Sequence, residues 1–183
     1  GGEGVKRRKR KKKKKTKKTK KRKGSMELEP EVIEAWLRCR VSAENLPPRS
    51  RSLFGKEVAP FPFIELHRYS PGGDPASTFE LVHRSPMVED TTEPKFLEFV
   101  VKLRLLCDGD EGRPIKVMVL DWQPKEEEAV PLGEFTTTLR QLRSGAERQT
   151  RFKLLTQSAA DKPSFVLFHA ADLHMRRPWE TVS

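Results

Sequence analysis

The sequence is poor in cysteine and has no long apolar segment. Its 183 residues contain two cysteines, Cys39 and Cys107, which are too few for a disulfide scaffold and are not spaced as metal ligands. No apolar run approaches the roughly 20 residues of a membrane-spanning helix. The charged N-terminal region has no apolar core behind it, which excludes a secretory signal. These absences predict a cytoplasmic protein in a reducing compartment.

The sequence also lacks the motifs of common catalytic sites. It contains no G-x-S-x-G, no Walker loop and no G-x-G-x-x-G. Neither cysteine has a neighbouring histidine or lysine that would lower the pKa of its thiol. The four histidines follow no metal-ligand spacing, and we interpret them as structural or surface residues: His67, His83, His169 and His174. We therefore expect no enzymatic activity, no small-molecule substrate and no cofactor.

Positive charge is concentrated at the N-terminus. Residues 1–25 contain sixteen lysines and arginines and one acid, Glu3, for a formal charge of +15. Because the whole chain carries +11, residues 26–183 carry −4. A segment of this charge density, with Val5 as its one sizeable apolar side chain, cannot form a core, and we predict that it is disordered. This distribution argues against a folded domain whose whole surface binds nucleic acid.

Three roles fit this basic tail. It can bind an anionic membrane leaflet, where each basic residue near the surface contributes about 1 kcal/mol. It can instead be a nuclear address or an arm that contacts nucleic-acid phosphates, or it can be a solvated linker. Candidate lipid contacts in its central run are Lys9, Lys11, Lys12, Lys13, Lys14 and Lys15. Composition alone leaves a peripheral membrane location in the cytoplasm and a nuclear location both open.

The remaining sequence has the pattern of short strands. From residue 33 to residue 41, apolar and polar residues alternate as in a half-buried strand. Further strands, separated by turn signals such as Pro71-Gly72-Gly73-Asp74, are predicted over residues 61–69, 78–84, 96–105, 115–122, 132–139, 152–155 and 165–171. A helical turn is predicted over residues 139–143. About eight strands without a long helix predict an all-β, antiparallel β-sandwich.

Several separated motifs resemble one known family. Residues 107–117 read C-D-G-D-E-G-R-P-I-K-V, Leu120-Asp121-Trp122 follows, and residues 132–139 read L-G-E-F-T-T-T-L. In this order they resemble the second C2 domain of the copines, as do residues 53–56 (L-F-G-K) and 93–96 (E-P-K-F). The resemblance covers nearly all of residues 33–172. It implies an eight-stranded sandwich with loops at one end that often bind calcium and phospholipid, here as a single, divergent C2 unit.

The resemblance also implies which residues would bind calcium. A copine-type C2 site draws its aspartates from two loops at one end of the sandwich. Only Asp121 clearly matches; the other positions fall on Ser52, Ala59, Gln123 and Pro131, with Glu126, Glu127 or Glu128 as substitutes for a middle aspartate. Calcium takes 6–8 oxygen ligands, largely carboxylates. We therefore expect no calcium binding, and we expect Asp121 to cap its loop through backbone N–H groups.

A second basic set is predicted on a strand face, where C2 domains often bind anionic headgroups. The candidates are Lys102 and Arg104 on one predicted strand and Lys116 on another. The alternative is that these are ordinary solvent-facing residues of half-buried strands.

We predict a disordered tail over residues 1–25, a C2-like domain over residues 26–175 and a frayed end over residues 176–183. The whole is interpreted as a monomeric, non-enzymatic and calcium-independent module that binds an anionic membrane surface or a protein partner. Nucleic acid would be contacted through the tail only. The alternatives are a nuclear or nucleic-acid-associated protein and a calcium-dependent phospholipid-binding C2 domain.

Overall fold

The computed structural model describes residue 1 and residues 34–51, 57–71, 78–156 and 162–176. The chain divides into two units, residues 1–30 and residues 31–183, and the second unit contains all the described strands and helices. Apart from Gly1, the predicted tail lies outside the described residues, and so do residues 177–183. The disorder of the tail and the domain boundaries therefore stay predictions.

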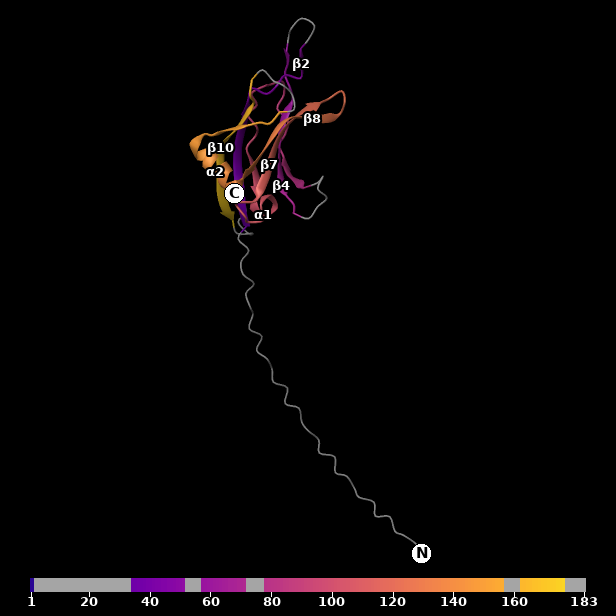
Figure 1. Ribbon diagram of the computed structural model, residues 1–183, viewed down its shortest axis with the longest axis vertical. Coiled ribbons are helices and arrows are strands. Elements are labelled where there is room, and N and C mark those ends of the chain that lie inside the picture. Colours follow the sequence, from indigo (N-terminus) through magenta and orange to yellow (C-terminus); the bar gives the residue numbers. More distant parts are fainter. Residues whose placement is uncertain (2–33, 52–56, 72–77, 157–161, 177–183) are drawn as a thin grey trace. The chain divides into compact units, whose positions relative to one another are not determined.

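The folded unit is built from two four-stranded antiparallel sheets (Figure 1). The β1 sheet has the strand order β6-β1-β10-β9, and the β4 sheet has the order β5-β4-β7-β8. The bounds are β1 Glu34–Glu44, β4 Pro62–Tyr69, β5 Phe79–Arg84, β6 Phe99–Lys102, β7 Pro114–Gln123, β8 Glu128–Thr138, β9 Arg151–Lys153 and β10 Phe165–Arg176. A short pair, β2 (Ser50–Arg51) and β3 (Glu57–Val58), and two helices, α1 (Leu103–Leu106) and α2 (Leu139–Arg148), complete the unit.

The core lies between the two sheets because the central strands direct alternate apolar side chains inward. Leu37 and Cys39 of β1 and Val117 and Val119 of β7 are fully buried in it. Burying an aliphatic side chain of this size stabilises the fold by about 1.5–3 kcal/mol. Burial also raises the pKa of the Cys39 thiol to about 12, so this group stays protonated and unreactive at neutral pH. The predicted eight-stranded antiparallel sandwich is confirmed.

The predicted strand over residues 96–105 is wrong at both ends. The strand β6 spans only Phe99–Lys102, and the chain then turns through α1. This turn places Leu106 and Cys107 in the core, and it ends at Gly109, whose φ of 80° favours glycine. A continuous apolar run has no period that separates a strand from a helical turn, so the sequence pattern could not show where β6 ends.

The helical turn predicted over residues 139–143 is the start of a ten-residue helix, α2. Thr138 caps its N-terminus, because the Thr138 hydroxyl accepts a hydrogen bond from the Gln141 backbone N–H at 3.2 Å. Leu139, Leu142 and Ala146 are buried at helical spacing. Neither α2 nor α1, the two helices in the described residues, is long and apolar enough to cross a membrane.

Gly145 in α2 gives a stability prediction that opposes helix propensity. Alanine in a helix is favoured over glycine by about 1 kcal/mol. However, a Cβ at Gly145 would lie 2.5 Å from Phe152 Cζ, and the Phe152 ring is itself packed against Phe135 and Phe168. Gly145→Ala should therefore lower the free energy of unfolding by about 1–3 kcal/mol through overpacking. Urea denaturation measures this, and a stabilised variant would contradict it.

Candidate functional site at Asp121

Asp121, the one aspartate that matches the calcium motif, lies near the end of β7 and accepts hydrogen bonds from two other segments. The Arg49 guanidinium donates from Nε to Asp121 Oδ2 at 2.8 Å and from Nη2 to Oδ1 at 2.5 Å. The Phe61 backbone N–H donates to Oδ1 at 2.8 Å. The Asp121 side chain is only 2% exposed, so these donors replace the hydrogen bonds that water would otherwise provide.

Arg49 is held beside Asp121 by further contacts. Its Nη2 also donates to the Trp122 carbonyl oxygen at 2.6 Å, and its guanidinium carbon lies 4.7 Å from the centre of the Phe61 ring. The Arg49 backbone N–H donates to the Val58 carbonyl oxygen at 2.8 Å, which ties this residue to β3. The hydrogen bonds to Asp121 raise the pKa of Arg49 above its ordinary value. A permanent positive charge therefore lies in contact with the buried carboxylate.

Arg49 is the residue that the sequence analysis missed. It lies three residues before the predicted ligand position Ser52, directly after Pro47-Pro48. A basic residue beside a predicted cation site was the available signal, but no motif pairs it with a residue 72 positions away. The Phe61 N–H is a backbone donor of the kind that the sequence predicted for Asp121, although it acts together with the guanidinium.

The other positions of the predicted calcium set offer few oxygen ligands. Ser52 lies outside the described residues, Ala59 and Gln123 are half-buried, and Pro131 is exposed. Three of these four side chains carry no carboxylate or hydroxyl oxygen. Within the described ranges, no group of three or more His, Cys, Asp or Glu side chains is placed to hold a metal ion.

The three glutamates predicted as substitutes lie at the tip of the β7–β8 hairpin. The two strands stay paired as far as Gln123 and Glu128, so residues 124–127 form a tight turn. Glu126, Glu127 and Glu128 are all exposed, and Glu127 has a positive φ of 53°. The negative charge of Glu126 contributes to the raised pKa of Arg49. The carboxylates at this end thus add to the field around Arg49.

A buried acid, Glu65, forms a second ionic cluster on the β4 sheet. Its side chain accepts a hydrogen bond from Arg84 Nε at 2.6 Å and contacts His67 Nε2 at 2.8 Å. Glu65 is only 4% exposed, although the alternating pattern of its strand gave no sign that an acid would be buried there. Nearby on β7, Lys116 lies 3.6 Å from Glu134 and over the Phe79 ring. The basic side chains of this sheet surface are therefore neutralised within the chain.

Comparison with known proteins identifies the fold. No protein-family model matches the sequence. The structure of BON1-C2B superimposes with a TM-score of 0.62 over 77% of this chain and 92% of that chain, at 13% identity. The folded unit has the C2 fold. A C2 domain of RIM from Drosophila (TM-score 0.38, 17% identity, 78% of this chain and 98% of that chain) and a C2 domain of plant Extended Synaptotagmin 1 (0.45, 15%, 81% and 98%) superimpose less closely.

In the C2 domain, the predicted headgroup-binding residues do not share one face. Lys102 lies on β6 in the β1 sheet, where it pairs with Glu34 at 3.0 Å and lies over the Trp36 ring. Lys116 lies on β7 in the β4 sheet. Arg104 was predicted on a strand, but it is an exposed residue of α1. The tail lysines 9 and 11–15 lie outside the described residues. Lipid binding by any of these residues stays a prediction.

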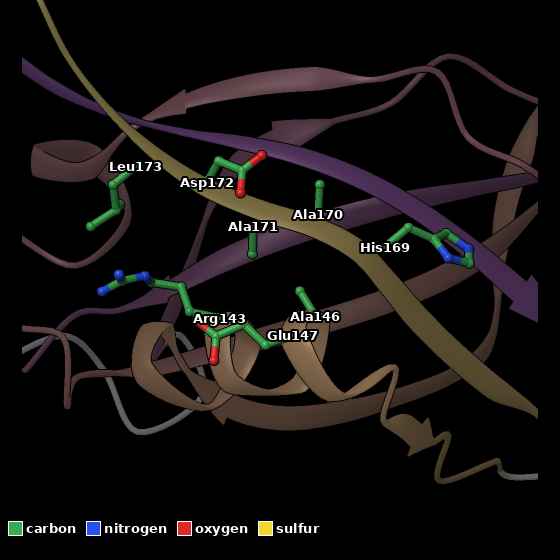
Figure 2. Close-up of a pocket in the computed structure, with 8 residues that line it drawn as sticks. All are labelled: Arg143, Ala146, Glu147, His169, Ala170, Ala171, Asp172 and Leu173. Carbon is green, nitrogen blue, oxygen red and sulfur yellow. The ribbon is translucent and has the colours of Figure 1, made fainter.

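A hydroxyl, an imidazole and an amide form a hydrogen-bonded chain beside a hollow of the C2 domain. Figure 2 shows the hollow, about 340 Å³, with Arg143, Ala146 and Glu147 of α2 facing residues 169–173 of β10. Gln149 Nε2 donates to the Ala146 carbonyl oxygen, so its Oε1 faces His169 Nδ1 at 3.3 Å. His169 Nε2 then accepts from Ser42 Oγ at 2.8 Å. Because Ser42 is buried, we interpret this chain as structural, joining β1, β10 and the end of α2.

His83 carries a prediction for pH dependence. Its ring stacks on Phe99 with centroids 4.1 Å apart, and its Nε2 has no hydrogen-bond partner among the described residues. Burial lowers the pKa of His83 below 6.5. The unfolded chain therefore takes up this proton first, so the stability that His83 contributes is complete above pH 6.5 and is lost as the pH falls towards its folded pKa.

His83→Leu removes the titrating group while keeping an apolar contact with Phe99. The wild type should lose more stability than His83→Leu when urea denaturation is repeated at pH values stepped down from neutrality. Equal losses would contradict the assignment, since the Glu65–His67 pair titrates in both proteins and cancels in the comparison.

Proposed function

We propose that the folded unit is a non-enzymatic C2 binding module that works without calcium, and that the basic tail supplies its attraction to anionic membrane surfaces. The observation that carries this proposal is the ion pair between Arg49 and Asp121. The pair places a positive side chain of the protein beside the one retained calcium-motif aspartate.

Arg49 opposes calcium binding in two ways. Both Asp121 oxygens already accept hydrogen bonds from N–H donors. A calcium ion would have to displace those donors and also approach a fixed guanidinium charge, which repels it. With Ala59, Gln123 and Pro131 at the other matching positions, too few carboxylates are available for the 6–8 oxygen ligands that calcium takes.

Without an ion, the folded unit is a poor match for an anionic leaflet. Residues 26–183 carry a net −4, and the exposed glutamates of the β7–β8 turn add negative charge beside the Asp121 site. Like charges repel at this range. Attraction to a membrane would then come from residues 6–23, and the folded unit would contribute orientation and contacts with proteins. A copine-like origin and a cytoplasmic, peripheral membrane location fit the same proposal.

A calcium titration of the full chain tests the proposal. We expect isothermal calorimetry, and NMR signals of β7 and its neighbours, to show no saturable calcium site tighter than about 100 micromolar, a limit well inside the range of weak extracellular modules. A saturable site tighter than that limit, with shifts at Asp121, would overturn the proposal. Asp121→Asn serves as the matched control, because binding that survives this change arises elsewhere in the chain.

A further inference from the structure

Exposed apolar side chains gather in one stretch of the C2 domain. Of the eight large apolar residues that are exposed in the described ranges, five fall between residues 81 and 105: Leu81, Met87, Leu97, Val100 and Leu105. This stretch contains β5, β6 and α1. Leu81 and Leu105, 49% and 51% exposed, line the same hollow although they come from β5 and α1. The concentration points to an interaction surface rather than to scattered exposure.

Two hollows meet at Leu105 and form what we call the α1 groove. The smaller, about 180 Å³, is lined by residues of β4 and β5 together with Leu105. The larger, about 680 Å³, continues past Leu103 and Leu105 to Ala35 at the start of β1. The helix α1 packs beside β1, β4 and β6, so it forms the wall that the two hollows share. The groove is long enough, and apolar enough at its centre, to accept several side chains.

The backbone beside this groove has an open edge. β5 is the terminal strand of the β4 sheet, and no described strand pairs with its outer side. An unpaired strand edge presents N–H and C=O groups that an extended peptide can pair with. The exposed side chain of Leu81 lies on this edge strand. An added strand would therefore reach backbone partners and the apolar hollow at the same time.

The charges around the α1 groove indicate the character of its ligand. Six charged side chains line the two hollows: Glu34, Arg68, Glu80, Lys102, Arg104 and Asp108. Arg68 pairs with Glu80 at 2.5 Å, Lys102 pairs with Glu34 at 3.0 Å, and Asp108 lies 3.7 Å from Arg113. Arg104 is exposed and has no ion partner among the described residues. The uncompensated charge is positive, and it calls for a carboxylate.

We propose that the α1 groove binds an extended segment of a partner protein that combines apolar side chains with acidic ones. The apolar side chains would fill the hollows on either side of Leu105, and a carboxylate would pair with Arg104. Glu34, Glu80 and Asp108 in the lining disfavour an anionic bilayer, which offers no separate cations. This inference rests on the proposed protein-binding role and adds the class of partner.

The test uses the full chain, labelled with nitrogen-15, and two peptides of alternating residues. One alternates leucine with glutamate, and its control alternates leucine with lysine. The leucine–glutamate peptide should shift the amide signals of residues 81–84 and 103–106, and the lysine peptide should shift them less. Binding of the acidic peptide to the basic tail affects other signals, so site-resolved shifts separate the two events. No calcium or lipid is present, so this measurement can fail without the calcium proposal failing.

Three variants decide the assignment. Arg104→Glu should weaken the leucine–glutamate peptide about tenfold at these signals, and it should favour the lysine peptide instead. Leu105→Asp should weaken both peptides. Leu155→Asp is the matched control, because Leu155 is 67% exposed and lies outside the groove lining. Two results overturn the proposal: shifts confined to the tail or unchanged in Arg104→Glu, and groove signals that move with protein concentration alone or with anionic vesicles.

Discussion

Replacing Arg49 with glutamine should lower the free energy of unfolding by about 3–5 kcal/mol. The change leaves the Asp121 carboxylate buried without its cation, with the Phe61 N–H as its remaining described donor. Breaking an exposed pair has a far smaller effect, about 0–1 kcal/mol. Arg68→Gln, which breaks the exposed pair with Glu80, is therefore the matched control. Urea denaturation of both variants at one pH measures the contrast.

The reverse substitution should be milder, because the two partners differ in their access to water. The Arg49 side chain is 21% exposed, so a guanidinium left alone can be partly hydrated. Asp121→Asn also keeps a side-chain oxygen that accepts from the same donors, and we expect a loss of about 1–3 kcal/mol. The double variant Arg49→Gln/Asp121→Asn should cost less than the sum of the two single losses, since it leaves no uncompensated buried charge.

If Arg49→Gln costs no more than Arg68→Gln, Arg49 is not the counter-ion of a buried carboxylate. The strongest argument against calcium binding would then be lost, and Asp121 would again be a free ligand. The stability measurement therefore bears on function as well as on packing.

The pattern of the sequence was sufficient for the sheets but not for the ionic pairs within them. Alternation placed Leu37, Cys39 and Val119 in the core because strand side chains point to opposite faces. The same logic assigned Glu65 to the solvent side of its strand, and the structure buries it between Arg84 and His67. Periodicity reports which face a residue is on, and it does not report what covers that face.

The candidate site shows the same limit over a longer distance. Motif comparison located Asp121 and showed that its expected companions are missing. It did not show what compensates the charge of Asp121, because Arg49 reaches it through the tertiary fold from 72 positions away. The end of β6 was missed for a different reason, since an apolar run gives no local signal for the turn at α1. Pairings between distant segments are therefore the part that only the structure supplied.

Removing residues 1–25 should lower the partition coefficient onto anionic vesicles by about a thousandfold or more. Each basic residue near an anionic surface contributes about 1 kcal/mol, and the segment holds sixteen. Engagement of about five of them corresponds to more than three powers of ten in affinity. The comparison needs the full chain and residues 26–183 on vesicles that contain phosphatidylserine, with neutral vesicles as the blank.

Two controls separate the tail from the basic side chains of the folded unit. Lys102→Gln/Lys116→Gln should change vesicle binding less than tenfold, about 1 kcal/mol in each case at most, because both lysines already pair with acids of the chain. Raising the salt from about 0.05 to about 0.5 M should weaken the full chain steeply, because a shorter Debye length screens charges that are not in contact.

Duplex DNA in the same salt series tests the nuclear alternative. A flexible arm of sixteen basic residues binds any dense array of phosphates, so some DNA binding through the tail is expected under either function. The membrane role requires that the full chain prefer anionic vesicles over DNA at about 0.15 M salt, where screening limits the attraction to near contact. A preference for DNA would identify the tail as a nucleic-acid arm. Vesicle binding that survives removal of the tail would instead place lipid recognition on the folded unit, where the described cations are largely paired.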